Sequence, residues 1–469
     1  MKRRFLLVLA LCSCIIVQAG GLMTNTNYHI AFDRMMARGA SFDIDAIFSN
    51  PAGLAWGHEG WQFSLNFQKP WQYRDINAIT PAGETMFEGK ASAPIVPALF
   101  ASYKKDRWAV SAMIGIVGSG GSVEYKNGVP MFNALIANTI TQLSGGLSQA
   151  VGGAIPAITQ DQYKFDSSMK GKQYIYGGQL NFTYKFTDNF AGAVGLRANY
   201  YDGYYRGHVI AGNHPTMGTL ANLKLDVDQR GWGFTPIFSL DFHKGPLTIA
   251  ARYEFRTKLR TTNSTNVLEA GLNTEEMIQK PLTQLVMGGA ITVEQAGAIV
   301  NGIQEKMGGG LDAYTAPYQD GAKTRYDMPA LLTVAVGYEF TPKLRATLEY
   351  HFFDDKNAKM ANDRQKELKH GTHEFLAGIE YDINDKFTVS CGGQRTDYGL
   401  SDGYQQDTSF ACDSYSIGLG GAWNINKTLR LNAGYFCSIY SDYTKPTSYG
   451  SEVFSRTNHV IGIGMDFKF

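Results

Sequence analysis

The chain contains 469 residues, carries a formal net charge of +1, and is 18% charged and 13% aromatic. This near-zero charge offers no basic surface for nucleic acid, and the charged fraction lies below the quarter that is usual in soluble domains. A mean hydropathy of −0.20 excludes a protein built from many membrane-spanning helices. It is compatible with a transmembrane β-barrel, in which alternating polar and apolar residues average the hydropathy away.

The first 19 residues have the composition of a secretory signal peptide. Basic residues at 2–4 precede an apolar run over 5–17, and Val17 and Ala19 form a small-residue cleavage site before Gly20. The run is too short to span a membrane. We therefore expect residues 1–19 to act as an export signal.

Residues 20–59 differ from the rest of the chain and predict a compact N-terminal plug, or hatch. The polar residues at 25–27 can cap a helix over 28–38. Four of its charged residues balance one another, as a plug inside a polar lumen requires, because an unpaired charge in a confined space is costly. These four are Arg34, Arg38, Asp43 and Asp45. A solvated N-terminal arm would have a similar composition, but the apolar residues of the segment favour packing against other parts of the protein.

The predicted hatch ends in the segment Asn50-Pro51-Ala52-Gly53-Leu54. Pro51 fixes φ and lacks an N–H, and Gly53 permits positive φ. Such a segment suits neither a helix nor a central strand, and an ordinary tight turn is the simplest interpretation. Its position between hatch and first strand supports a second interpretation, in which a rigid kink sets how the hatch meets the barrel.

From Trp61 onward, alternating strands are separated by short polar turns and by longer connections. The six short turns fall at 104–107, 187–189, 243–246, 341–343, 384–386 and 426–427. Short turns on one side and long loops on the other are typical of an outer-membrane barrel. Six short turns imply seven hairpins, and therefore about fourteen antiparallel strands over residues 60–469.

The alternation has two possible meanings. In a soluble sandwich the apolar face points inward, and in a membrane barrel it points to the lipid. Predicted strand lengths of about ten residues, and aromatic residues at the strand ends, favour the membrane. Those aromatic residues are Tyr184, Phe186, Tyr338, Phe340, Tyr381 and Trp423. The last strand ends in Phe469, which resembles the signal by which the barrel-assembly machinery recognises outer-membrane barrels.

Two long connections, 119–172 and 263–325, carry helical periodicity. Capping boxes are predicted at 273–276 and 292–295. The apolar positions of the two connections form stripes that predict an outer-loop groove for a hydrophobic molecule, or a self-packed lid over the barrel mouth. These positions are Ile136, Ile140, Leu143, Leu147, Ile299, Val300 and Ile303.

The sequence contains no pattern that indicates catalysis or a cofactor. It has no G-x-S-x-G elbow and no phosphate-binding G-x-x-x-x-G-K-[ST] motif. Beyond the predicted signal, Cys391, Cys412 and Cys437 have neither a disulfide pattern nor metal-ligand spacing. Asp397, Asp402 and Asp407 could hold Ca²⁺, although a solvated acidic loop is the simpler interpretation. We expect no enzyme activity, no cofactor and no metal, with a lipid hydrolase as a remote alternative.

The segment Ala40–Leu54, and above all its Asn-Pro-Ala element, resembles the N-terminal hatch of the FadL family of outer-membrane transporters for hydrophobic compounds. The resemblance implies passive uptake of long-chain fatty acids or similar molecules across the outer membrane of a Gram-negative bacterium. In that family the ligand leaves sideways into the membrane through a kink in the third strand. Here that strand would be Trp108–Val117, with Gly115 and Gly118 as the candidate kink. A surface adhesin or structural barrel is the alternative.

Family members hold the carboxylate of a fatty acid with basic side chains. No motif transfers those positions, so the candidates are the arginines that alternation places inward, and each could instead pair with Glu254, Glu349 or Asp241. The candidates are Arg197, Arg252, Arg256, Arg345 and Arg430.

Overall fold

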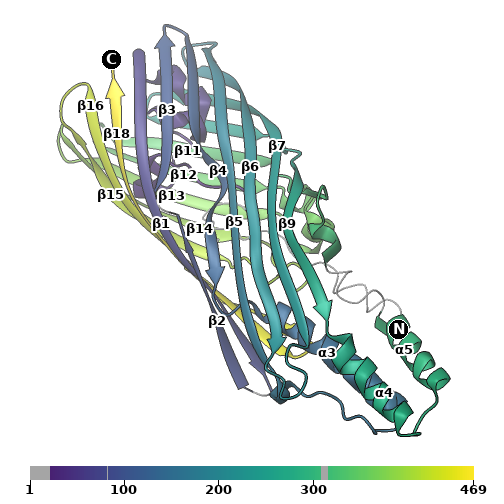
Figure 1. Ribbon diagram of the computed structural model, residues 1–469. Coiled ribbons are helices and arrows are strands. Elements are labelled where there is room, and N and C mark those ends of the chain that lie inside the picture. Colours follow the sequence, from purple (N-terminus) through teal and green to yellow (C-terminus); the bar gives the residue numbers. More distant parts are fainter. Residues whose placement is uncertain (1–21, 82, 94, 308–314) are drawn as a thin grey trace.

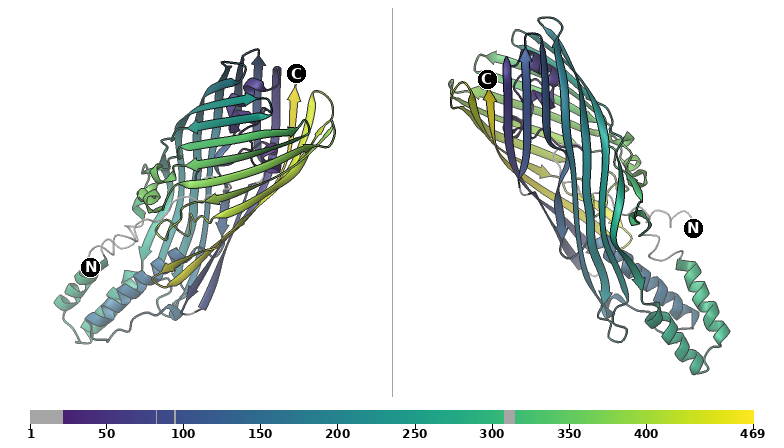
Figure 2. Two further views of the ribbon diagram at one scale, coloured as in Figure 1. Left: turned by 180° about the vertical axis from the view of Figure 1, so that it is seen from behind. Right: turned by 45° about the horizontal axis from the view of Figure 1, so that its top comes forward.

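The computed structural model describes residues 22–81, 83–93, 95–307 and 315–469, and these form one closed antiparallel barrel with helices inside it and at one end (Figure 1). The predicted signal peptide lies outside the described residues. We call the end that carries the short turns the turn end, and the opposite end the loop end. Both the C-terminus and the N-terminal helices lie at the turn end (Figure 2).

The described part of the chain forms eighteen strands in one sheet. In four places two consecutive strands pair with the same neighbour and share one position, so the barrel has fourteen positions, as predicted. The shared positions belong to β2 with β3, β8 with β9, β10 with β11, and β16 with β17. The strands are β1 Gly60–Thr80, β2 Gly83–Ser92, β3 Val96–Lys105, β4 Trp108–Tyr125, β5 Lys164–Lys185, β6 Phe190–Gly212, β7 Ala221–Lys244, β8 Leu247–Glu254, β9 Arg260–Leu272, β10 Lys323–Arg325, β11 Leu331–Thr341, β12 Leu344–Phe353, β13 Thr372–Asp382, β14 Phe387–Asp397, β15 Ser414–Asn424, β16 Leu429–Tyr440, β17 Tyr443–Thr447 and β18 Gly450–Lys468.

The barrel closes between its first and last strands. β1 pairs with β18 from Gln62 opposite Lys468 to Ile79 opposite Ser451. The Trp61 N–H also donates to the carbonyl of the terminal Phe469, at 3.1 Å. All six predicted short turns join neighbouring strands at the turn end. Closure between β1 and β18 leaves no free sheet edge there. Such an edge would expose unpaired backbone groups to lipid, which is energetically costly.

The predicted uniform strand length of about ten residues is wrong for one side of the barrel. β5, β6 and β7 contain 22, 23 and 24 residues. Their pairing continues toward the loop end into charged positions such as Lys170 opposite Arg206, where water replaces lipid. The two long connections are correspondingly shorter than predicted, because 119–125, 164–172, 263–272 and 323–325 belong to strands.

The apolar residues of the strands point outward and the polar ones inward, which excludes the sandwich alternative. Leu180, Leu348 and Ile463 are 68%, 65% and 63% exposed on the outer face. The predicted aromatic positions at the turn end are exposed there as well. Buried polar side chains such as Gln62 and Asn66 face the lumen. This arrangement is that of a barrel whose solvent on the outside is lipid.

The hatch lies within the turn end of the barrel and consists of three short helical segments: α1 Ile30–Met35, α2 Ala46–Ser49 and η2 Pro51–Trp56. The predicted helix over 28–38 is too long at both ends. His29 caps α1, since its Nδ1 accepts from the Ala31 N–H at 3.1 Å. Met36, with φ of 66°, ends the helix. The helix is therefore capped by His29 and not directly by residues 25–27, although Asn27 Oδ1 supports this end by accepting from the His29 N–H at 2.9 Å.

The remaining helices are α3 Pro130–Ala150, η3 Gln160–Gln162, η4 Glu275–Gln279, α4 Lys280–Met287, α5 Val293–Met307, η5 Ala316–Tyr318, η6 Asp355–Asn357 and η7 Ala361–Glu367. α3, α4 and α5 project beyond the loop end (Figure 2). At α5 the predicted capping box is present, because the Gln295 N–H donates to Thr292 Oγ1 at 3.2 Å and the Thr292 N–H donates to Gln295 Oε1 at 2.8 Å. Within the described ranges, no helix combines the length and apolarity that a membrane crossing requires.

Candidate functional site

The Asn50–Leu54 motif joins the hatch to the barrel wall. Asn50 Nδ2 donates to Asp241 Oδ2 on β7 at 2.8 Å, and the Ala52 N–H donates to Ser239 Oγ on the same strand at 3.0 Å. From β5, Thr183 Oγ1 donates to the Pro51 carbonyl at 2.8 Å. The motif therefore uses its backbone and one amide side chain to bind two strands at once.

The expectation that this motif is incompatible with a helix is wrong. Pro51 occupies the first position of the 3-10 helix η2, where its missing N–H removes a donor that would have no intrahelical partner. Asn50 is the extended residue between α2 and η2, with φ of −160°. Gly53 does not serve to provide positive φ. It is required because a Cβ at this position would overlap the Ser41 carbonyl.

The four predicted charges of the hatch are paired, partly with the barrel, whereas the buried Asp33 only accepts from Gln68 Nε2 at 2.8 Å. Arg34 forms an ion pair with Glu380 on β13 and donates to Ser390 Oγ at 2.8 Å. Arg38 pairs with Asp45 inside the hatch, at 2.6 Å from Nε to Oδ2. Asp43 lies 3.7 Å from Lys468 Nζ. These pairs fill the lumen at the turn end with bonded polar groups.

α1 reaches the barrel wall through inward-facing glycines. A Cβ at these positions would overlap or crowd atoms of α1. Because glycine has no Cβ, the helix can lie directly on the backbone of the last strands. The glycines are Gly378, Gly392, Gly418, Gly420, Gly434, Gly462 and Gly464. This close approach explains part of the high glycine content.

The sheet is interrupted between its second and third positions, and we call this interruption the lateral gap. β2 ends at Ser92 and β3 begins at Val96. β4 pairs with β3 up to Ile114 and with β2 only from Ser122 onward, so its residues 115–121 have no ladder partner on that side. On its other side, β4 shifts register against β5 between Ile116 and Gly118 and again between Ser119 and Gly121.

The predicted kink residues lie at this interruption. Gly115 is the first unpaired residue of β4, and Gly118 lies at the first register shift. A Cβ on Gly118 would approach the Met23 carbonyl of the hatch to 2.5 Å. The Asn25 N–H donates to the Val117 carbonyl at 3.0 Å. The N-terminal part of the hatch is therefore bonded to the inner side of the irregular strand.

A small apolar cluster closes the lateral gap. Ala93 and Val96 from the second position pack with Ile116 from the third, and Tyr28 of the hatch and Tyr174 of β5 pack against them. The Tyr28 hydroxyl accepts a hydrogen bond from Asn25 Nδ2 at 2.8 Å. Five side chains, one of them from the hatch, thus separate the lumen from the outer face at this gap.

Two of the candidate arginines line a small lumenal cavity on the loop-end side of the hatch. Arg197 and Arg252 both contact Glu254, and their guanidinium carbons lie 5.6 and 5.3 Å from the ring centre of Phe48 in the hatch. Both arginines thus pair with a barrel carboxylate, which was the alternative to ligand binding, although the two cations share Glu254. Val117 lines the same cavity, which connects it to the lateral gap.

The same cavity carries His351, which the sequence indicates, together with Glu349, only as one of the polar residues expected in a barrel lumen. His351 Nε2 lies 2.6 Å from Glu349 Oε1, and its Nδ1 lies 2.9 Å from Glu374 Oε2. Glu349 also accepts from the Gly39 N–H of the hatch, at 2.7 Å. This triad joins the hatch to β12 and β13 through hydrogen bonds alone.

The other three candidates lie elsewhere. Arg345 and Arg430 line a polar cavity on the turn-end side of the hatch, where Arg345 pairs with Glu380 and with Asp382 at 2.7 Å. Arg256 lies beyond the end of β8, is exposed, and donates to the Asn357 carbonyl at 2.6 Å. The expectation that Arg256 points inward is wrong, because the strand alternation ends at Glu254.

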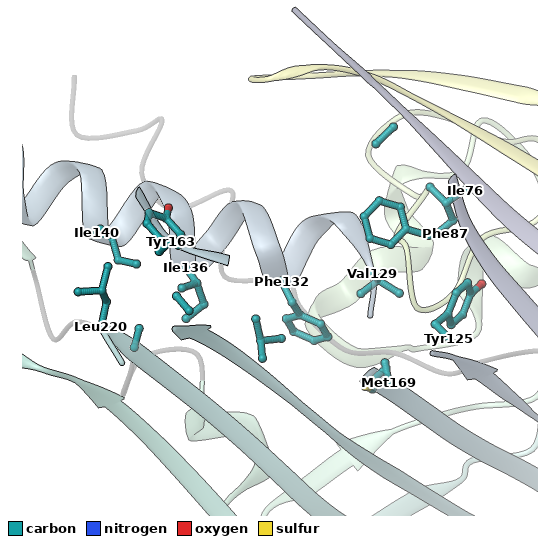
Figure 3. Packing of buried hydrophobic residues seen from close by; sticks show 14 of the residues in the cluster. Ile76, Phe87, Tyr125, Val129, Phe132, Ile136, Ile140, Tyr163, Met169 and Leu220 are labelled. Carbon is teal, nitrogen blue, oxygen red and sulfur yellow. The ribbon is translucent and has the colours of Figure 1, made fainter. Parts of the chain in front are cut away.

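The predicted groove residues of the outer helices are engaged in packing. Ile136, Ile140, Leu143, Leu147 and Ile303 are buried in one apolar cluster, and Ile299 and Val300 pack against it (Figure 3). A small, mostly apolar cavity lies beside this cluster, lined by Phe132, Leu135 and residues of β5, β6, β7 and β9. The structure therefore places the helix stripes in a self-packed lid, with an apolar cavity between the lid and the strands.

No cluster of three or more metal-ligating side chains occurs in the part of the chain that the structure describes. The three aspartates of the acidic loop have protein partners. Asp407 Oδ2 accepts from the Met131 N–H of α3 at 2.7 Å, Asp402 accepts from the Tyr443 hydroxyl at 2.9 Å, and Asp397 lies 3.7 Å from His370.

The sequence contains one indication of the lateral gap that the prediction did not use. Pro70, Pro94 and Pro97 stand in the first two strand segments. Proline cannot donate to a ladder and therefore marks edges and interruptions of sheets. Tyr28 carried no comparable signal, because its role depends on residues distant in the sequence.

These features define a hatch-plugged fourteen-strand barrel with an interrupted wall. No protein-family model and no curated protein sequence matches the chain. Among solved structures, a Pseudomonas aeruginosa FadL homologue matches 96% of this chain and 100% of its own with a TM-score of 0.61 and 14% identity.

Two further structures are similar over nearly the whole chain. The Pseudomonas putida toluene transporter TodX aligns with 96% of this chain and 100% of its own, with a TM-score of 0.58 and 14% identity. The Ralstonia pickettii toluene transporter TbuX aligns with 90% and 94%, with a TM-score of 0.50 and 16% identity. The chain therefore has the fold of the FadL-type barrels, which confirms at the level of fold the resemblance seen in residues 40–54.

Proposed function

We propose that this protein carries hydrophobic molecules passively across the outer membrane of a Gram-negative bacterium and releases them sideways through the lateral gap. The observation that carries this proposal is the gap itself. Its lining of Ala93, Val96 and Ile116 is apolar, and one of the side chains that closes it, Tyr28, belongs to the hatch. A displacement of the hatch N-terminus would therefore open a path from lumen to lipid.

The contacts of the hatch argue against a straight path through the barrel. Arg34 and Glu380 form a buried pair, and separating such a pair costs about 3–5 kcal/mol. α1 lies on the glycine wall, and Asn50 and Pro51 bond to two further strands. By contrast, residues 22–28 form no ion pair among the described residues. They are held by one backbone bond to β4 at Val117, by the bonds of Asn27 to Asp45 and Ser49, and by the burial of Leu22 and Met23. Movement of residues 22–28 therefore separates no buried ion pair, and we propose it as the change that opens the path.

We propose long-chain fatty acids as the substrates. Arg197 and Arg252 line the cavity beside the gap and share the single carboxylate of Glu254. The Nε of each arginine has no hydrogen-bond partner among the described residues, so a ligand carboxylate that enters this cavity can accept from these N–H groups. The two toluene transporters of the same fold make neutral aromatic compounds the competing substrate class.

The test is uptake of labelled oleate and labelled toluene by cells that lack their own transporter of this kind. The matched strains carry the empty vector, the full chain, and a chain without residues 22–28. The proposal predicts that the full chain raises oleate uptake and that the shortened chain changes its rate. Toluene uptake without oleate uptake would contradict the fatty-acid assignment, and unchanged uptake of both would contradict transport and favour an adhesive or structural barrel.

A further inference from the structure

Lys69 places a charge on the outer face of the barrel, where its neighbours are apolar. On β1 it follows Phe67 and precedes Trp71 among the outward-facing residues, and its side chain is exposed. The residue opposite it on β18 is Ile461, which is 52% exposed. Charged side chains on the lipid-facing surface of a barrel are destabilising and therefore require a compensating role.

The position of Lys69 along β1 coincides with the lateral gap. β1 pairs with β3 only as far as Gln68 opposite Val96, and with β2 only from Trp71 opposite Ser92. Lys69 and Pro70 are thus the β1 residues that face the interruption. Pro70 has no N–H to offer to the second strand position.

The ammonium of Lys69 is bonded to the edge of the gap. Its Nζ donates to the Ala93 carbonyl at 2.9 Å. Ala93 follows the last residue of β2 and belongs to the cluster that closes the gap. The cation is therefore held at the outer mouth of the opening, on the side where a molecule leaving the lumen would meet the membrane.

We propose that Lys69 receives the carboxylate of a long-chain monocarboxylate as it leaves through the lateral gap. This inference rests on the proposed function and assigns a specificity-determining residue to its exit. An ammonium has three donors, and the Ala93 carbonyl uses one of them. The carboxylate passes from the paired arginines Arg197 and Arg252 inside the barrel to Lys69 outside it, while its alkyl chain follows the apolar lining.

Lys69 could instead act only as a tie that holds the broken strand together. The two roles differ in their dependence on the substrate. A tie affects every molecule that uses the gap, whereas a carboxylate acceptor distinguishes an acid from its alcohol. Oleate and oleyl alcohol have the same chain and differ in this one group, so they separate the two roles.

The experiment measures initial uptake of labelled oleate and labelled oleyl alcohol in cells carrying the wild type, Lys69→Met or Lys69→Arg. Lys90→Met is the matched control, because Lys90 is another exposed, outward-facing lysine and lies on β2 beyond the gap. Surface abundance and heat-modifiable migration on gels verify that each barrel is folded.

We expect Lys69→Met to lower oleate uptake about threefold, as suits a partly exposed charge pair, and to leave uptake of the alcohol unchanged. Lys69→Arg should keep the wild-type ratio of the two rates, and so should Lys90→Met. An equal loss for both probes, or no loss for either, would overturn the inference while leaving transport intact. A wild type that takes up neither probe above the empty vector would overturn the proposed function and this inference with it.

Discussion

Replacement of Asn50 by alanine tests how the hatch is anchored. Asn50 Nδ2 donates to Asp241 Oδ2 at 2.8 Å, and Asp241 is 1% exposed. The other carboxylate oxygen, Oδ1, has no hydrogen-bond partner among the described residues. Asn50→Ala would therefore leave a buried carboxyl group without a donor. A buried polar group that loses its hydrogen-bond partner costs about 1–3 kcal/mol, so we expect the hatch to detach locally more easily by about 2 kcal/mol.

The assay is hydrogen exchange of the hatch amides in detergent-solubilised protein. The Ala52 N–H is bonded to Ser239 Oγ on the same strand as Asp241, and it reports on opening of this joint. A change of about 2 kcal/mol corresponds to exchange that is about 30-fold faster. Asp241→Asn keeps an acceptor for Asn50 and should keep most of the protection.

Asn199→Ala is the matched control for Asn50→Ala. Asn199 is a buried lumenal asparagine whose amide donates to Thr235 Oγ1 at 2.8 Å and to the Arg197 carbonyl, both on the barrel. Its loss should leave the Ala52 exchange rate unchanged. If Asn50→Ala also leaves that rate unchanged, the motif does not anchor the hatch and the reasoning is refuted.

Three further predictions concern the ion pairs, the gap and the outer helices. Glu380→Gln removes the charged partner of the buried Arg34 and should lower the stability of the docked hatch by about 3–5 kcal/mol. Trypsin should then cleave the hatch at lower urea concentrations than in the wild type. Unchanged cleavage would show that the pair is not needed. Tyr28→Ala removes the aromatic side chain that the hatch contributes to the cluster at the lateral gap. It should raise the entry rate of a hydrophobic dye such as Nile red without changing the melting temperature of the barrel. An unchanged entry rate would show that Tyr28 does not close the gap. Burial, with the Glu452 carboxylate nearby, raises the pKa of Asp407 to about 8 against the opposing effect of Lys445, so folding favours its protonated form. The hydrogen bond from the Met131 N–H itself favours the ionised carboxylate, but an opening of this contact that exposes Asp407 to water should become easier as the pH rises from about 4 to about 8. Exchange of the Met131 amide, corrected for its intrinsic rate, should show this dependence, and Asp407→Asn should abolish it; equal pH profiles for both proteins would contradict it.

The barrel could be predicted from sequence because its determinants are local. A short turn needs particular residues at two or three adjacent positions, and outward-facing alternation is visible within one strand. All six turns were therefore found. Strand length was not, because pairing beyond the lipid depends on what the neighbouring strand offers, as at Lys170 opposite Arg206.

The hatch and the lumen were harder to predict because their determinants are distant in sequence. Arg34 and Glu380 are 346 residues apart, and nothing near either residue indicates the other. The ends of α1 depend on glycines of β13–β18, and Tyr28 acquires its role only through Ala93 and Ile116. Local periodicity correctly located the outer helices, but the identity of their packing partners required the structure.

The central claim is that hydrophobic molecules pass through the lateral gap, and a crosslink across that gap tests it most directly. Val96 and Ile116 belong to the same cluster on opposite sides of the gap. The variant Val96→Cys/Ile116→Cys is made in a background in which Cys391, Cys412 and Cys437 are replaced by alanine, and crosslinking is quantified on gels. We predict that oxidation abolishes oleate uptake and that reduction restores it. Undiminished uptake by fully crosslinked protein would contradict the account.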